Sequence, residues 1–325
     1  MNTDTYIIIG GLGGGGDIGL AILLARSAGL PLNRVVAVSF HKCTITRGRL
    51  RDIAVRGAVI RIPKGYFPDN RVFEDKLPFI YPGLEGRIYA VCTRDTWREM
   101  MEGLMYLIDT YKPSCMLHTD LGGDGLVTGY EETLGSYKTD TVARALLAEA
   151  ADLVGVKSIT AVGCTGCEGG GDELSDEWLA ATLIYAEKHS ALIGVTEPSM
   201  DYTGEIKALL TLAESGMLPY YLAALRGKKT ARIDMAYLRG EYQVKPWHRK
   251  VYVLDTVKHC GISLICRQAT GRGVEALRNY EKYKPKPPRE LRQICTTIKR
   301  RGANYGYSLL GKRKMPVTRL VKLCG

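Results

Sequence analysis

The chain has 325 residues, of which 46% are hydrophobic and 24% are charged, and its formal net charge is +11. This composition excludes a disordered or fibrous protein, and the length allows one large domain or two smaller ones. The charge is unevenly distributed, because residues 1–225 carry 20 basic and 28 acidic side chains whereas residues 226–325 carry 25 basic and 6 acidic ones. We therefore expect a first domain over residues 1–225 and a basic C-terminal region over residues 226–325 that packs on the first domain or extends it.

The hydropathy pattern indicates a cytoplasmic protein. No run of 18 residues is continuously apolar, so we expect no membrane span, and no basic segment precedes the first apolar run as a signal peptide requires. Only five Asn and three Gln occur, which suggests a thermophilic source. In such a source the nine scattered cysteines could form intracellular disulfides.

The predicted elements alternate between strands and helices from the N-terminus onward. Short apolar runs predict strands and amphipathic or apolar longer segments predict helices. Strands are expected at 5–10, 34–39, 87–92, 114–120 and 157–163, and helices at 17–27, 95–111, 139–153 and 174–188, the third with Thr139 or Asp140 as its N-cap. This order predicts an α/β fold with a Rossmann-like open, mostly parallel sheet and helices on both faces.

The basic region gives weaker signals. Residues 249–255 could add a strand, residues 289–300 form an expected helix after a proline-rich break, and the tail at 299–314 is expected to be a loop.

Three of the predicted strands end in glycine-rich loops that contain acidic residues. Loops that follow parallel strands emerge at the same edge of a sheet, where ligands bind in open α/β folds. The acidic side chains that could converge there are Asp17, Asp120, Asp124, Glu132, Asp140, Glu168 and Asp172.

The first loop contains Gly13, Gly14, Gly15 and Gly16, followed by Asp17 and a helix. Such a loop lets the backbone and the helix N-terminus approach a phosphate, so it predicts binding of a nucleotide or another phosphate-containing small molecule. A tight strand-to-helix turn is the structural alternative. The second strand ends without the carboxylate that NAD requires, although Lys42 or Arg47 could meet the 2′-phosphate of NADP.

The second loop, which follows the strand at 114–120, has the most specific pattern. Asp120 and Asp124 flank Gly122 and Gly123, and they could bind Mg²⁺ together with Asp17. Glu131 or Glu132 could supply a further oxygen or a base. In the alternative, both aspartates only stabilise the turn.

At these residues the chain resembles an archaeal family known only as a domain of unknown function. The resemblance covers about residues 5–190 and rests on the Gly-Gly-Gly-Gly-Asp at 13–17 and on the central motif at 120–136, which is followed by Asp140. The chain departs from the family at 136–139, where Ser-Tyr-Lys-Thr replaces a common Ser-Pro. The resemblance implies a Rossmann-like α/β fold and an archaeal source, but no particular activity.

The third loop contains Cys164 and Cys167 in a Cys-x-x-Cys pattern, and then Gly169 and Gly170. We expect these glycines to close the other side of the ligand site. The cysteines could pack as small residues, form a redox pair or disulfide, or bind a metal, although a second suitably spaced cysteine pair is missing.

His118 is the best candidate for acid–base chemistry among the five histidines. It lies two residues before Asp120, so the two side chains would point to the same side of a strand. A buried core histidine is the alternative. His41, which follows the second strand, is a weaker candidate of the same kind.

The basic region also suggests an RNA partner. Its tyrosines, among them Tyr305 and Tyr307, lie between basic clusters and could stack on unpaired bases. A solvated basic surface, an acidic protein partner and a flap over a phosphorylated ligand are the alternatives.

The leading hypothesis is an enzyme or sensor that binds a nucleotide or phosphorylated metabolite with Mg²⁺, as a phosphotransferase or hydrolase would. Its catalytic candidates are Asp120, Asp124, Glu132 and His118, and its metal candidates are Asp17, Asp120 and Asp124. An RNA-binding protein and an NADP-dependent oxidoreductase are the alternative functions.

Overall fold

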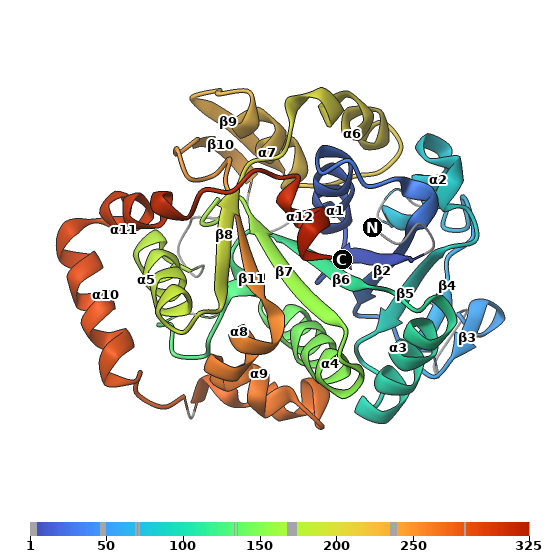
Figure 1. The fold of residues 1–325 in the computed structure, drawn as a ribbon, viewed down its shortest axis with the longest axis horizontal. Helices are drawn as coiled ribbons and strands as arrows, with labels where there is room; N and C mark the ends of the chain where they lie inside the picture. Colours follow the sequence, from blue (N-terminus) through green and yellow to red (C-terminus); the bar gives the residue numbers. More distant parts are fainter. Residues whose placement is uncertain are drawn as a thin grey trace.

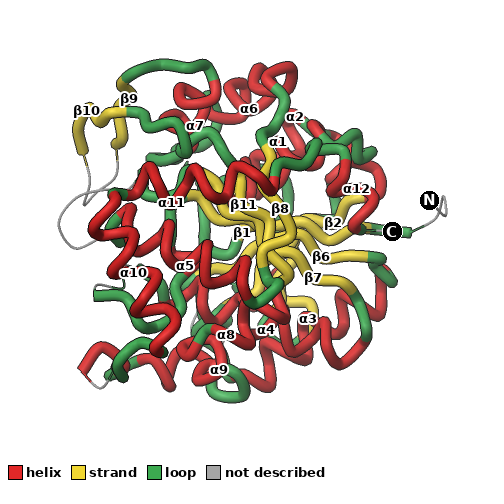
Figure 2. The backbone as a smooth tube through the Cα atoms, turned by 60° about the vertical axis from the view of Figure 1, so that its left-hand side comes forward, coloured by secondary structure: helices red, strands yellow, loops and turns green. Residues whose placement is uncertain are grey.

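The computed structural model describes residues 5–45, 50–68, 70, 72–132, 134, 136–167, 174–234, 239–282 and 284–324. Within these residues nine strands form one sheet in the order β3-β4-β5-β2-β1-β6-β7-β11-β8, with helices on both faces (Figures 1 and 2). Its strands are β1 (Ile7–Gly11), β2 (Val35–His41), β3 (Ala54–Arg56), β4 (Val59–Arg61), β5 (Ile88–Cys92), β6 (Cys115–Leu121), β7 (Lys157–Gly163), β8 (Leu192–Thr196) and β11 (Val251–Asp255). A separate hairpin consists of β9 (Thr230–Asp234) and β10 (Arg239–Gln243). The predicted Rossmann-like α/β class is confirmed.

The two faces of the sheet have separate hydrophobic cores, because strand side chains alternate between the faces. In β1, Ile8 belongs to one core and Ile7 and Ile9 to the other. The helices are α1 (Gly16–Ser27), α2 (Leu77–Ile80), α3 (Trp97–Tyr111), α4 (Lys138–Val154), α5 (Asp176–Lys188), α6 (Thr203–Leu210), α7 (Leu218–Leu225), α8 (Thr256–Ile262), α9 (Leu264–Ala269), α10 (Arg289–Arg301), α11 (Ala303–Leu310) and α12 (Arg319–Leu323). Among the described residues, none of these helices combines the length and the apolar character that crossing a membrane requires.

The strand order reverses between β1 and β6. Strands β5, β2, β1, β6 and β7 are parallel, and the chain passes from β1 to β2 on one side before it returns to β6 on the other. In open α/β sheets such a reversal leaves a crevice at the carboxyl ends of the two strands. The loops after β1 and β6, which carry the acidic motifs, therefore open into the same crevice.

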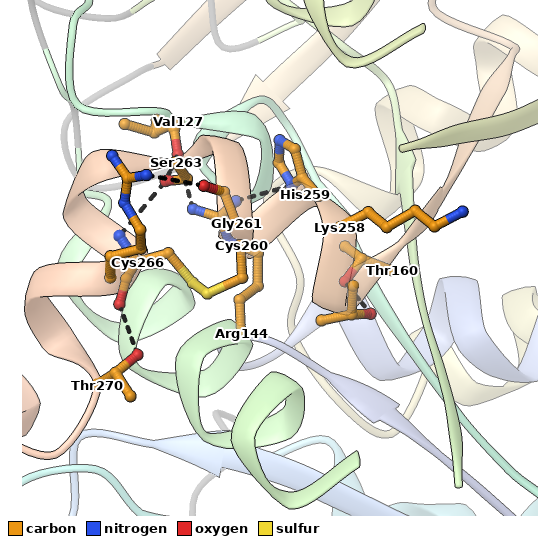
Figure 3. Close-up of a disulfide and its surroundings, with 12 residues drawn as sticks. Val127, Arg144, Thr160, Lys258, His259, Cys260, Gly261, Ser263, Cys266 and Thr270 are labelled. Carbon is orange, nitrogen blue, oxygen red and sulfur yellow. Dashed lines mark hydrogen bonds between the residues drawn. A yellow bond between two sulfur atoms is a disulfide. The ribbon is translucent and has the colours of Figure 1, made fainter. Parts of the chain in front are cut away.

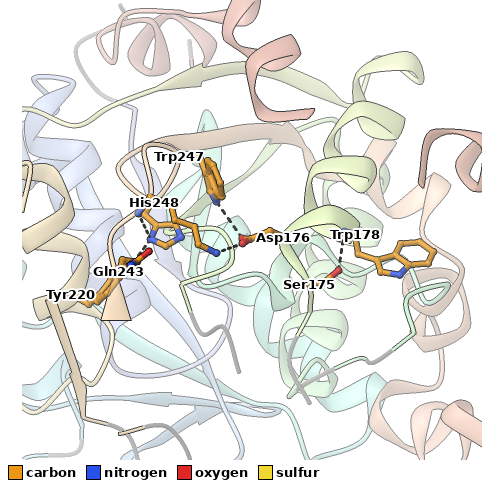
Figure 4. A network of polar contacts seen from close by, with 8 residues as sticks. Ser175, Asp176, Trp178, Tyr220, Gln243, Trp247 and His248 are labelled. Carbon is orange, nitrogen blue, oxygen red and sulfur yellow. Dashed lines mark hydrogen bonds and ion pairs between the residues drawn. The ribbon is translucent and has the colours of Figure 1, made fainter. Parts of the chain in front are cut away.

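The basic C-terminal region is built into the sheet. Strand β11 lies between β7 and β8 and is antiparallel to both. Helices α8 and α9 pack against α4, and α10 and α11 pack against α5. Trp247 donates a hydrogen bond of 3.3 Å from Nε1 to Asp176 at the start of α5, and Lys245 forms an ion pair with the same carboxylate (Figure 4).

Two local predictions are wrong. Residues 303–310 of the expected loop form α11, because Tyr307 and Leu310 bury an apolar face against the core. Helix α4 begins at Lys138 rather than at residue 139, so its N-cap is Tyr137, which makes no side-chain capping hydrogen bond. Thr139 and Asp140 therefore belong to the first turn of α4 instead of capping it.

Eight of the nine cysteines form disulfides, which fits one of the alternatives for Cys164 and Cys167. The pairs are Cys43–Cys92, Cys115–Cys324, Cys164–Cys167 and Cys260–Cys266, and Cys295 is free and buried. Cys115–Cys324 joins positions 209 residues apart and ties the C-terminus to β6, whereas Cys164–Cys167 spans a separation of only three. A cross-link that closes a longer loop restricts the unfolded chain more.

Replacing Cys324 should therefore destabilise the protein. We expect Cys324→Ser to lower the free energy of unfolding by about 3–5 kcal/mol under oxidising conditions, because the longest cross-linked loop is opened. Chemical denaturation of wild type and variant measures this difference. In a reductant that opens all disulfides, wild type and variant should differ in their free energy of unfolding only by the small packing cost of serine. If the difference is equally large in the reductant, the disulfide does not account for it.

Candidate active site at the reversal point of the sheet

A cavity of about 790 Å³ opens at the carboxyl ends of β1, β2 and β6. This volume lies in the range of small-molecule and cofactor sites. The lining residues are Gly13, Gly14, Gly15, Gly16, Asp17, Phe40, His41, Lys42, Asp120, Leu121, Asp124, Ser136, Thr139, Asp140, Glu214, Ser215, Gly216 and Met217. The first and second acidic loops thus meet, as the sequence predicts for their carboxylates.

Three buried carboxylates form the floor of this cavity. Asp17, Asp120 and Asp140 each place a carboxylate oxygen within 4.8 Å of the other two. With modest adjustment such a group can surround one hard cation, for which carboxylates are the preferred ligands. The sequence analysis named Asp17, Asp120 and Asp124 as metal candidates, and the closest group of three in the described part of the structure contains Asp140 in addition to Asp17 and Asp120.

Backbone groups hold two of these carboxylates in position. Asp17 accepts hydrogen bonds from Gly13 N at 2.9 Å and from Leu121 N at 3.0 Å, so it connects the loops after β1 and β6. Asp120 accepts a hydrogen bond of 2.9 Å from Gly125 N. Because main-chain donors orient these carboxylates, the trio is positioned by the fold itself.

The glycine loop needs glycine at two positions for different reasons. A Cβ atom at Gly13 would stand only 3.0 Å from carboxylate oxygens of both Asp17 and Asp140. Gly15 precedes α1 with a φ of 67°, a conformation that other residues rarely adopt. Among the described residues, the N–H groups of Gly14 and Gly15 have no hydrogen-bond partner, so they can donate to a ligand.

Asp124 lies beside the trio and contributes a fourth carboxylate. Its Oδ2 atom accepts a hydrogen bond from the Ser136 hydroxyl. Its Oδ1 atom is buried and has no hydrogen-bond partner among the described residues. A buried polar atom without a partner is costly, so this oxygen favours a ligand in the cavity.

The carboxylates influence one another strongly. Burial raises the pKa of Asp17 and Asp140 well above the ordinary value, and the nearby Asp120 raises both further. Burial, and then the charge of Asp124, raises the pKa of Asp120 to about 7, and burial raises that of Asp124 to about 6. The metal-free site therefore retains protons that a divalent cation would displace.

Arg144 places a buried positive charge near these carboxylates. It lies one helical turn after Asp140 on α4, and burial lowers its pKa to about 10 even though the aspartates oppose this effect. Its guanidinium donates to Val127 O at 2.8 Å and lies 3.0 Å from His259 Nδ1 (Figure 3). Arg144 remains protonated and offsets part of the negative charge.

His41 lines the cavity next to the glycine loop. Its Nε2 atom lies 3.0 Å from the fully buried Glu74 Oε1, and its ring lies 3.5 Å from the position of a Cβ atom at Gly14. Burial lowers the pKa of His41, but Glu74 outweighs it and raises the pKa overall. The weaker histidine candidate thus has the better geometry for acid–base work, with Glu74 as its orienting partner.

Two predicted catalytic residues lie away from the cavity. His118 is fully buried below it, where its Nε2 atom lies 3.0 Å from Val38 O and burial lowers its pKa to about 3. This environment is that of a core histidine. Glu132 is 67% exposed and forms an ion pair with Lys299, whereas the neighbouring Glu131 is buried and accepts backbone hydrogen bonds.

Gly122 and Gly123 do not line the cavity either. Gly122 donates a hydrogen bond of 3.0 Å to Gly163 O, and Gly123 packs against Leu179 of α5. Both therefore serve the packing of the β6 loop. Gly169 and Gly170, together with Glu168 and Asp172, lie outside the described residues.

Several residues in or near the cavity were not predicted from the sequence. The segment 214–217 forms one wall, and no motif marks it. Glu74 gives no signal either, because it approaches His41 from a separate part of the chain. Arg144 could have been found, since Asp140 and Arg144 have the i, i+4 spacing of neighbours on a helix.

The pKa shifts predict how the stability of the metal-free protein depends on pH. Because the pKa of Asp120 is higher in the folded than in the unfolded chain, the folded protein binds more protons between about pH 4 and 7, and stability falls as the pH rises through this range. In the variant Asp120→Asn, the free energy of unfolding should decline much less over this pH range than in wild type. Denaturant unfolding in EDTA at about pH 5 and about pH 8 measures it, and an equal decline in both proteins would contradict the assignment.

The comparisons with known proteins identify a family but no activity. No curated protein and no solved structure matches the chain. Residues 67–275 match the model of a family described as "Protein of unknown function (DUF1152)", a range that includes the β6 loop and α4 but not the glycine loop. The chain belongs to this family of proteins of unknown function.

Proposed function

We propose that the chain binds a divalent cation of the Mg²⁺ type together with a nucleotide or another phosphorylated small molecule. The observation that carries this proposal is the trio Asp17, Asp120 and Asp140, which lies beside the glycine loop in one cavity. A cation on the trio would bridge to phosphate oxygens, as Mg²⁺ usually does in proteins. The partnerless Oδ1 atom of Asp124 offers this cation or its water shell a further ligand.

The charge distribution in the cavity supports a phosphate in addition to the metal. The aspartates lie on the floor and Glu214 lies in the wall at 214–217, whereas His41 and Lys42 lie at the end of β2 in the same lining. The N–H groups of Gly14 and Gly15 at the start of α1 can donate to phosphate oxygens. A phosphate between these groups would face positive or donor groups on one side and the cation on the other.

The reaction that suits this arrangement is phosphoryl transfer or phosphate ester hydrolysis. A bound Mg²⁺ stabilises the charge that develops on phosphate oxygens, and His41, oriented by Glu74, can accept or donate a proton near the glycine loop. In this proposal Asp120 is a metal ligand, whereas His118 and Glu132 have structural roles.

The two alternative functions gain no comparable support. Stacking of RNA bases requires exposed rings, but Tyr307 is buried and stacks on Trp247 with ring centroids 4.6 Å apart. Arg301 covers the Tyr305 ring at 4.7 Å. An NADP-dependent reductase remains a hypothesis, since Lys42 lines the cavity and Arg47 lies outside the described residues.

Metal binding provides the test of the proposed function. We expect Asp120→Asn to weaken Mg²⁺ binding at least tenfold, about 1.4 kcal/mol, because a ligand is lost, whereas Asp152→Asn on the exposed part of α4 should bind like wild type. Isothermal titration calorimetry measures the affinities. ATP should raise the melting temperature clearly only when Mg²⁺ is present. At an ATP concentration of 100 times its Kd, the expected gain in the free energy of unfolding is about 2.7 kcal/mol. Equal Mg²⁺-dependent shifts in wild type and Asp120→Asn would refute the metal site.

A further inference from the structure

A second, smaller cavity of about 260 Å³ adjoins the main cavity. It shares Lys42, Ser136 and Thr139 with the lining of the main cavity, so the two cavities have a common wall. Its own lining adds Arg94 and Lys138. The main cavity has four aspartates in its lining, whereas this one has three cations and no carboxylate.

The three cations have no close carboxylate partner in the described part of the chain, although the charge of Lys42 acts on Asp124, where it opposes the rise in pKa that burial causes. Among the described residues, none of Lys42, Arg94 and Lys138 forms an ion pair. Three like charges around one cavity repel one another, and an anion bound between them offsets that repulsion. The hydroxyl group of Thr139 and the first turn of α4, which has no side-chain cap, add hydrogen-bond donors, whereas the Ser136 hydroxyl donates to Asp124.

The fold fixes the segments that carry these cations. The disulfide Cys43–Cys92 joins the residue after Lys42 to the residue before Thr93, and Arg94 follows directly. Thr93 strengthens this connection, because both its N–H group at 2.8 Å and its hydroxyl at 3.0 Å donate to His41 O. Lys42 and Arg94 are thus held at one side of the second cavity before any ligand binds.

We propose that this second cavity is a subsite for another phosphate group of the ligand that occupies the main cavity. The ligand would then carry at least two phosphate groups, one at the cation on the carboxylate trio and one between Lys42, Arg94 and Lys138. This inference rests on the proposed function for the main cavity. It narrows the ligand to polyphosphorylated or bisphosphorylated small molecules.

A series of polyphosphates of increasing length tests the subsite in the full-length protein. Inorganic phosphate, pyrophosphate, tripolyphosphate and tetrapolyphosphate are titrated with excess Mg²⁺ into wild type and into the double variant Arg94→Gln/Lys138→Gln. A control variant, Arg98→Gln/Lys157→Gln, loses the same charge from exposed residues outside both cavities. All three proteins should have similar melting temperatures, because Arg94, Arg98 and Lys157 are exposed and Lys138 is half-buried.

The subsite predicts a difference that depends on the length of the ligand. The subsite variant should bind the longer polyphosphates at least about tenfold more weakly than wild type, since two charge-assisted contacts are lost, and inorganic phosphate almost equally well. The control variant should follow wild type. An equal loss for phosphate and for the longer ligands, or an equal loss in the control, would overturn the subsite.

A titration without Mg²⁺ separates this inference from the proposed function. If wild type binds no Mg²⁺ but tripolyphosphate in EDTA still binds more weakly to the subsite variant than to the control, the metal proposal fails and the anion subsite stands. If wild type binds Mg²⁺ and Mg²⁺–phosphate but the subsite variant matches the control for every polyphosphate, the subsite is refuted and the metal proposal stands.

Discussion

The burial of four aspartates in one crevice is the constraint on which the rest of the site depends. Burial raises the pKa of Asp120 to about 7, with a further contribution from the charge of Asp124, and burial raises the pKa of Asp124 to about 6. Arg144 supplies one buried positive charge nearby, which cannot balance four negative ones. The remaining charge must be met by bound protons or by a cation, and in the proposed function the cation displaces the protons. The fold supports this arrangement with backbone donors to Asp17 and Asp120 and with a glycine at residue 13, where a side chain would collide with two of the carboxylates.

The sequence predicts this edge of the sheet well because the signals are local. Apolar runs that end in glycine and aspartate mark β1 and β6, and parallel strands bring their loops together without further information. The close approach of Asp140 to Asp17 and Asp120 could not be predicted, since it depends on where α4 begins. The partnership of Glu74 with His41 and the wall at 214–217 depend on packing between distant segments. His118 was predicted to be a catalytic residue, but it does not line the cavity and is fully buried. Period-two alternation predicts to which side of a strand a side chain points, but not whether it reaches the cavity at the end of that strand.

The net charge of the chain is a poor guide to where an anion would bind. The basic final third supplies partners for the acidic body, as in the pairs Lys299–Glu132, Arg313–Glu187 and Lys245–Asp176. Exposed pairs of this kind contribute little stability, but they reduce the positive charge that is free on that surface. The cations of the two cavities, Lys42, Arg94 and Lys138, belong instead to residues 1–225, where acidic side chains outnumber basic ones. The proposed anion site therefore follows from the position of these cations relative to the sheet edge, and not from composition.

In the proposed function, the opposite charges on the two sides of the cavity also couple the metal ion and the phosphate to each other. A phosphate without a cation would face the aspartates of the floor, and a cation without a phosphate would have to displace protons from Asp120 and its neighbours. Each ligand lowers the electrostatic cost of binding the other, and this coupling is equal in both directions. A phosphorylated molecule with its metal can then bind in only one orientation, with the cation on the carboxylates and the remaining anionic groups toward Lys42. The proposed function therefore implies a preference for a metal–phosphate complex over either component alone.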